Sequence, residues 1–96
     1  MITSFGDQAT ADLYHGRATQ RVRRFPPEMV GTALRKLDML HASRELRDLR
    51  SPPGNHLESL KGVLKEFYSI RVNEQWRVVF KWEGSNAFNV KVTDYH

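Results

Sequence analysis

From Pro26 onward the apolar residues recur at steps of three and four positions. They are Met29, Val30, Ala33, Leu34, Leu37 and Leu40. Only an α-helix places residues at this spacing on one face. Pro26 and Pro27 suit the first turn of a helix, where a missing backbone N–H costs no hydrogen bond. We therefore predict a helix that begins at Pro26 and keeps Arg35, Lys36 and Asp38 on its solvent side.

The N-terminal part of the chain predicts a shorter helix. Residues 2–4 are compatible with a short strand, and a helix of about ten residues follows before Gly16 stops it. Ser4 and Asp7 have the spacing of a capping box. The side chains expected to face the core are those of Phe5, Ala9, Leu13 and Tyr14. Residues 43–49, after the long helix, have room for one or two further turns before the next prolines.

Beyond residue 67 the apolar residues alternate with polar ones, which is the period of a β-strand. The alternating sets are Tyr68, Ile70 and Val72; Trp76, Val78, Phe80 and Trp82; and Phe88, Val90 and Val92. Turn-rich segments at 73–75 and 84–86 join these strands into an antiparallel meander. Residues 57–61 are predicted as a fourth strand. The expected fold class is α+β, with two N-terminal helices and a short third one packed on the sheet face that bears the tryptophans.

The composition indicates one small folded domain spanning residues 1–96. The chain has 96 residues, 40% of them hydrophobic, and a chain of this size builds a single core. It has no cysteine, which excludes disulfides, thiolate metal sites and thiol nucleophiles. No stretch approaches the roughly 18 apolar residues of a membrane span, and the N-terminus lacks the pattern of an export signal. We expect a cytoplasmic protein without membrane contact.

Positive charge is expected to gather on the sheet face opposite the tryptophans. The formal net charge is +4. Strand alternation directs four basic side chains outward on that face, namely Arg71, Arg77, Lys81 and Lys91. Lys61 lies nearby in this scheme, and Glu83 is the main counter-charge. Such a face suits phosphate groups, because an arginine grips two phosphate oxygens at once. The alternative is a solvated face, and in either case an outward Arg77 is expected to contribute little to the core.

Two other groups of side chains could take part in binding or catalysis. The arginines of residues 21–24 are interpreted as a solvated loop or as a contact to the ribosome or to nucleic acid. The sequence closes on Asp94, Tyr95 and His96. Histidine exchanges a proton near neutral pH, tyrosine stacks on a base and aspartate orients either one. A frayed terminus is the alternative interpretation. The histidines show no paired ligand spacing, so no metal site is predicted.

Three motifs in a fixed order resemble the HigB branch of the RelE/ParE toxins. They are Leu60-Lys61-Gly62, the strand from Tyr68-Ser69-Ile70 to Gln75-Trp76-Arg77, and the closing Asp94-Tyr95-His96. Pro52-Pro53-Gly54-Asn55 and the helical hairpin before it are also similar, so the resemblance covers nearly the whole chain. It implies two helices packed on an antiparallel sheet, and a type II toxin that cleaves mRNA in the ribosomal A site without a cofactor.

The resemblance also implies roles for individual residues. Cleavage is attack by a ribose 2′-hydroxyl on the adjacent phosphate, which requires a proton acceptor, a proton donor and cations. Asp94, Tyr95 and His96 match the family's active-site motif, and Lys61 and Arg77 match basic residues that contact the phosphate. Further nucleic-acid contacts are expected from Arg71, Gln75, Lys81, Lys91 and His56. The implied partners are the ribosome with mRNA, a small helix-turn-helix antitoxin of the HigA type, and operator DNA bound by the toxin–antitoxin complex.

One position departs from the family pattern. Glu58 stands where several HigB toxins have a catalytic histidine, three residues before Lys61. Either Glu58 serves as the general base, or His56 substitutes for the histidine, because two residues along a strand share a face. Alternatively, Glu58 only pairs with Lys61 or Arg77, and the protein is a weakly active or non-cleaving module that blocks the A site and represses its own operon. A third alternative is the ParE branch, whose target is DNA gyrase and which generally lacks the terminal acid-aromatic-histidine group.

Overall fold

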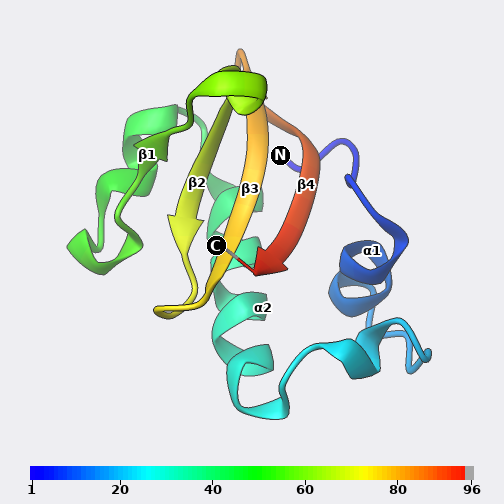
Figure 1. Ribbon diagram of the computed structural model, residues 1–96. Coiled ribbons are helices and arrows are strands. Elements are labelled where there is room, and N and C mark those ends of the chain that lie inside the picture. Colours follow the sequence, from blue (N-terminus) through cyan, green and yellow to red (C-terminus); the bar gives the residue numbers. More distant parts are fainter. Residues whose placement is uncertain (95–96) are drawn as a thin grey trace.

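The computed structural model describes residues 1–94 and shows a four-stranded antiparallel sheet in the order β1-β2-β3-β4, with helices packed on one of its faces (Figure 1). The α-helices are α1 (Gln8–Tyr14) and α2 (Pro27–Ala42), and the 3-10 helices are η1 (Val22–Arg24), η2 (Leu46–Arg50), η3 (Pro53–Asn55) and η4 (Gly62–Leu64). The strands are β1 (Glu58–Ser59), β2 (Phe67–Arg71), β3 (Trp76–Glu83) and β4 (Asn86–Asp94). The α+β fold class predicted from the sequence is confirmed.

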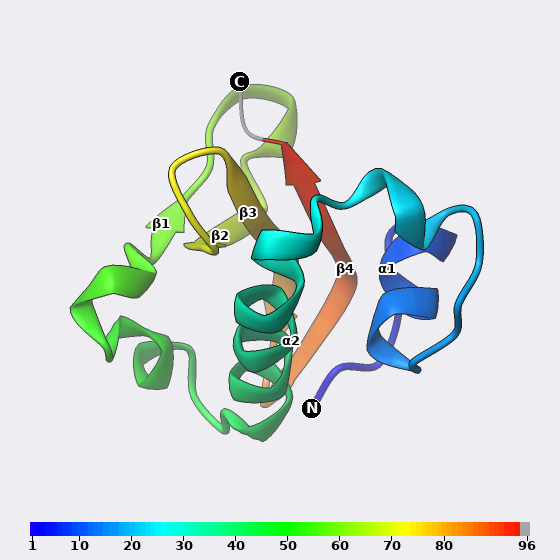
Figure 2. The same ribbon diagram turned by 90° about the horizontal axis from the view of Figure 1, so that it is seen from below.

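Helix α2 crosses one face of the sheet and forms the centre of the core (Figure 2). Its stripe of apolar residues faces inward as predicted, and Ala33, Leu37 and Leu40 are fully buried. They meet buried sheet residues that include Ile70, Val78, Phe80, Val90 and Val92. One solvent-side assignment is wrong, because Lys36 is half-buried and donates a hydrogen bond from Nζ to Asn55 Oδ1. Among residues 1–94, no helix combines the length and the apolar character needed to cross a membrane.

The N-terminal segment lies along the outer edge of β4, and this position changes how α1 begins. Isolated parallel bridges join Ile2 to Ala87 and Phe5 to Val90, in place of the predicted strand at residues 2–4. Ser4 does not cap the helix as predicted, because its Oγ accepts a hydrogen bond from the backbone N–H of Asn89 at 2.8 Å. Asp7 caps α1 instead, which shortens the helix to seven residues. The helix ends at Tyr14, and Gly16, the predicted stop, follows two residues later with φ of +71°.

The other edge strand is also shorter than predicted. Of residues 57–61 only Glu58 and Ser59 pair with β2 as a strand. The segment before them is η3, which ends with His56 in the left-handed conformation, and the segment after them turns into η4. The additional turns predicted for residues 43–49 are present as η2. Backbone turns therefore interrupt β1 at both ends.

A bulge in β4 moves Phe88 to the opposite face from the one predicted. Val79 is paired with Lys91, but Lys81 is paired with Phe88, so two residues of β4 lie opposite Phe80. Asn89, within the bulge, has φ of +53°. The extra residue shifts the alternation by one position. Ala87 consequently occupies the buried position, and Phe88 is half-exposed on the face away from α2.

Candidate functional site

The face of the sheet away from α2, here called the open face, carries the predicted basic residues in rows. Directly paired residues in an antiparallel sheet project to the same side. The register places Arg71, Arg77 and Thr93 in one row. The next row contains Glu58, Ser69, Val79 and Lys91, and Lys81 lies one row farther along. The structure therefore brings Arg71, Arg77, Lys81 and Lys91 onto one face, as predicted.

Arg77 differs from its predicted state because it is buried. Only 5% of its surface is exposed. Its Nη1 donates hydrogen bonds to the backbone carbonyl oxygens of Asn73 at 2.6 Å and Trp76 at 3.3 Å. A buried guanidinium needs such acceptors, because an unsatisfied charged donor is costly away from water. The expectation that Arg77 is a solvent-exposed side chain outside the packed part of the protein is therefore wrong.

The connection between β2 and β3 holds a second candidate residue as well. Asn73 Oδ1 accepts hydrogen bonds from the backbone N–H groups of Gln75 at 2.9 Å and Trp76 at 2.8 Å. The side chain of Gln75 then donates from Nε2 to Asp94 Oδ2 at 2.9 Å. Gln75, which the sequence suggested as a nucleic-acid contact, thus binds the carboxylate of another candidate residue. One short turn contacts both Arg77 and Asp94.

The two lysines on the open face have different surroundings. Lys81 Nζ lies 3.8 Å from Glu66 Oε2 and 5.2 Å from the centre of the Phe67 ring. Lys91 is exposed, and within residues 1–94 it forms no ion pair. Glu83 was predicted as the main counter-charge, but Glu66 is the acid that pairs with Lys81. Lys91 is therefore the more available cation for an incoming anion.

The segment around β1 holds three further candidates, and all of them are exposed. Glu58 lies opposite Ser69 at the edge of the sheet, and Lys61 directly precedes η4. No ion pair joins Glu58 to Lys61 in the described part of the chain. His56 ends η3 with φ of +45° and lies outside the strand. The prediction that His56 and Glu58 share a strand face is therefore wrong, because the strand begins only at Glu58.

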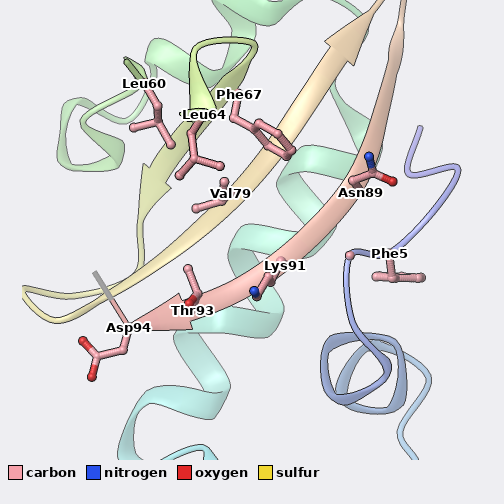
Figure 3. Close-up of a pocket in the computed structure, with 10 residues that line it drawn as sticks. Phe5, Leu60, Leu64, Phe67, Val79, Asn89, Lys91, Thr93 and Asp94 are labelled. Carbon is pink, nitrogen blue, oxygen red and sulfur yellow. The ribbon is translucent and has the colours of Figure 1, made fainter. Parts of the chain in front are cut away.

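A groove of about 530 Å³ lies on the open face beside these residues (Figure 3). Its apolar wall consists of Leu60, Leu64, Phe67 and Val79, and β4 contributes Asn89, Lys91, Thr93 and Asp94. Sequence reasoning missed this groove. Its signal was Val79, an apolar residue at an outward position between two basic ones in the same strand. The groove joins an apolar surface to the end of β4.

The arginines of residues 21–24 are partly engaged in ion pairs with α1. Arg21 Nη1 lies 3.5 Å from Asp12 Oδ2, and Arg24 Nη2 lies 2.7 Å from Asp7 Oδ2. A hydrogen bond from Gln8 lowers the pKa of Asp12 against the opposing effect of burial, with help from Thr19, Arg17 and Arg21. These contacts attach the loop to α1. A wholly solvated loop is therefore not what the structure shows.

Two of the predicted site residues, Tyr95 and His96, lie outside the described residues. Among residues 1–94, no group of three or more His, Cys, Asp or Glu side chains could hold a metal ion. Of the candidate residues within residues 1–94, Arg71, Arg77 and Lys91 lie on the open face, Asp94 lies at the end of β4, and Glu58 and Lys61 lie near the β1 edge.

Comparison with known families identifies the chain. Residues 3–96 match the family model described as the RelE-like toxin of the type II toxin-antitoxin system HigB. The chain belongs to the HigB-like toxins. It is 39% identical to Toxin HigB-1 of Vibrio cholerae over 89 residues, which cover 93% of this chain and 92% of that protein. It is also 45% identical over 67 residues to an uncharacterized protein of Haemophilus influenzae, covering 70% of this chain and 66% of that one.

Solved structures share the fold of this HigB-like toxin. The YoeB-YefM complex from Staphylococcus aureus matches with a TM-score of 0.61 and 21% identity, covering 100% of this chain and 95% of the other. The YoeB/ParE toxin from Agrobacterium tumefaciens matches with a TM-score of 0.55 and 18% identity, covering 99% and 98% of the two chains. At these identities the likeness establishes the fold alone. The chain is thus a RelE-like type II toxin by family, and it shares the fold of these solved structures.

Proposed function

We propose that this HigB-like toxin is a ribosome-dependent endoribonuclease that cleaves mRNA in the A site and so inhibits translation. The observation that carries the proposal is the row of Arg71 and Arg77 on the open face. Asp94 lies at the end of the neighbouring strand β4, directly after Thr93 of that row, and with Lys91 it lines the adjoining groove. Cations stabilise the charge that develops on a phosphate under attack. A carboxylate beside them orients a proton-transferring group.

In the proposed reaction, the ribose 2′-hydroxyl attacks the adjacent phosphate, and the bond to the 5′-oxygen of the next nucleotide breaks. Arg77 and Lys61 contact the phosphate, and Glu58 or His56 accepts the proton of the 2′-hydroxyl. His96 donates a proton to the leaving oxygen, Asp94 orients it, and Tyr95 stacks on a base. The reaction uses no metal or cofactor. Arg71, Lys81 and Lys91 contact the RNA backbone, with Gln75 acting through Asp94.

The proposed regulation follows the organisation of a toxin-antitoxin system. A small helix-turn-helix antitoxin of the HigA type neutralises the toxin in the cytoplasm, and the complex binds operator DNA. The YoeB structure solved together with YefM supports an antitoxin partner for a toxin of this fold. Co-purification of the toxin with the protein encoded beside it tests this pairing.

The decisive experiment is a translation reaction with purified ribosomes, in which the ends of the mRNA are mapped. We expect the wild-type chain to produce new ends at the A-site codon. His96→Ala should reduce the cleavage rate by roughly 10²–10⁴-fold, the range for a positioned acid or base. Glu58→Ala and His56→Ala, measured in parallel, identify the proton acceptor. Arg77→Lys should also lose rate, because lysine cannot reproduce the geometry of the guanidinium.

A second candidate function is a module that blocks the A site without cleaving. The observation that favours it is Glu58, an exposed acid at the position where a basic proton acceptor is expected. In the same assay this function would stop translation and leave the mRNA intact. Full cleavage by His96→Ala would contradict the assignment of His96. An unaffected translation reaction would contradict both functions and favour a gyrase target.

A further inference from the structure

The turn between β2 and β3 is exposed, yet its residues form several hydrogen bonds with each other and with Arg77 and Asp94. Asn73 is exposed and contributes nothing to the core. Its side-chain oxygen nevertheless binds the backbone N–H groups of Gln75 and Trp76, and its backbone carbonyl accepts from Arg77 at 2.6 Å. Asparagine is favoured in turns because its side chain imitates a backbone acceptor in this way. The side chain of Asn73 thus binds the turn itself, whereas its backbone carbonyl binds Arg77.

The same turn reaches Asp94 through Gln75. The Gln75 backbone N–H is held by Asn73, and its side-chain amide donates to Asp94 Oδ2 at 2.9 Å. Trp76, the next residue, is paired with Asp94 across β3 and β4. An arginine and an aspartate from neighbouring strands are therefore both hydrogen-bonded to one segment. Their relative position depends on the conformation of residues 73–75.

We infer that Asn73 is a positioning residue of the active site, acting through Arg77 directly and through Gln75 on Asp94. This inference rests on the proposed function. Loss of the Asn73 side-chain oxygen leaves two backbone N–H groups to water and allows the turn to rotate. The carbonyl that holds Arg77 and the amide that holds Asp94 then move together. A misplacement of about 1 Å in a catalytic constellation is enough to lower a rate by about 10²-fold.

The experiment compares Asn73→Ala, Asn73→Asp and Gln75→Leu with the wild-type chain in the ribosome cleavage assay. Each rate is measured at saturating toxin, and the half-saturating concentration is recorded separately. Asn73→Ala should lower the saturated rate by about 10- to 100-fold and leave the half-saturating concentration within about twofold. Asn73→Asp retains the acceptor oxygen and should restore most of the rate. Gln75→Leu alters an exposed side chain without threatening the fold, and should lower the rate in the same manner.

Asp48→Ala is the matched control. Asp48 Oδ2 accepts hydrogen bonds from the backbone N–H groups of Arg44 and Glu45, both at 3.0 Å. Its removal costs the same kind of contact as Asn73→Ala, but in η2, which is remote from Arg77 and Asp94 in the sequence. The melting temperatures of the two variants should fall by similar amounts. Only Asn73→Ala should lose cleavage.

The outcomes separate this inference from the function on which it rests. Absence of cleavage by the wild-type chain would overturn the proposed function and, with it, the inference. Wild-type cleavage together with an unaffected Asn73→Ala would overturn the inference alone. An equal loss of rate in Asp48→Ala would show that stability, not position, is responsible. If Asn73→Ala fails to fold, Gln75→Leu decides, and a rise in half-saturating concentration at unchanged saturated rate would show an RNA contact instead.

Discussion

The carboxylate of Asp7 joins two separate parts of the chain. Its Oδ1 accepts from the backbone N–H of Thr10 at 2.8 Å and caps α1, and its Oδ2 binds Arg24 at 2.7 Å. Burial alone would raise the pKa of Asp7, but the hydrogen bonds from Thr10 and the charge of Arg24 outweigh it and lower the pKa. One side chain therefore anchors both the start of the first helix and the basic loop.

This lowered pKa predicts an acid sensitivity. An acid whose pKa is lower in the folded state adds stability above its unfolded pKa, about 3.9, and loses it as the pH falls through the folded value. The melting temperature should therefore decline as the pH is lowered below about 4. Asp7→Asn keeps an N-cap oxygen but has no charge to lose, so its decline should be shallower. Parallel curves for the two proteins, measured by circular dichroism from pH 7 to pH 2, would contradict this role of Asp7.

At the scale of elements, the N-terminal segment and the β4 bulge fit closely together. Gly6 lies so near β4 that a Cβ atom there would meet the Asn89 carbonyl oxygen at 2.8 Å and Lys91 Cβ at 3.2 Å. The backbone N–H of Gly6 donates to the Val90 carbonyl at 2.7 Å. Gly6 also lines the groove of the open face. The missing side chain thus permits the segment to follow β4.

Gly6→Ala should therefore destabilise the protein by about 1–3 kcal/mol, as overpacking does in general. Gly31→Ala is the matched control, because Gly31 lies exposed in α2 and its nearest contact would be Arg35 Nη1 at 3.9 Å. Alanine replaces glycine in a helix with a gain of about 0.5–1 kcal/mol. Urea unfolding of both variants measures the two changes. A neutral or stabilising Gly6→Ala would show that the segment moves away from β4 at little cost.

At the scale of the whole molecule, basic side chains gather on one face of the sheet. The open face carries Arg71, Arg77, Lys81 and Lys91 in three adjacent rows, and the other face is covered by α2. Of the two lysines, Lys81 is engaged with Glu66 and Phe67, whereas Lys91 borders the groove. A polyanion that binds this face would displace counterions from its phosphates, and the affinity would fall with salt.

We predict that the logarithm of the association constant for a short single-stranded RNA falls linearly with the logarithm of the salt concentration, with a slope of about −0.7 for each phosphate contact. Lys91→Glu should remove at least one phosphate contact and so reduce the magnitude of the slope by about 0.7 or more. Lys81→Glu should reduce it less, because Lys81 already has an acidic neighbour. Arg44→Glu makes the same charge reversal in the loop after α2 and serves as the control. Fluorescence anisotropy over a salt series would contradict the assignment if all three reversals acted equally.

The sequence by itself determined the elements whose signal is periodic. The stripe of α2 and the alternation of β2 and β3 are local properties, because burial of one face selects residues at a fixed spacing. They also placed Arg71, Arg77, Lys81 and Lys91 on one face without further information. The motifs of residues 60–62, 68–77 and 94–96 indicated the family correctly, and the family model matches residues 3–96.

Only the tertiary structure decided the features that depend on contacts between distant residues. Ser4 does not form the predicted capping box, because its Oγ accepts a hydrogen bond from the backbone N–H of Asn89, which is distant in the sequence. The bulge that reversed Phe88 follows from fitting β4 to β3, and a single inserted residue leaves no mark on the local pattern. Arg77 is buried and hydrogen-bonded to the turn that precedes it, and the alternation of the strand indicates neither. Periodicity assigns a side chain to a face of a sheet, whereas its accessibility and its partners depend on what other segments place against that face.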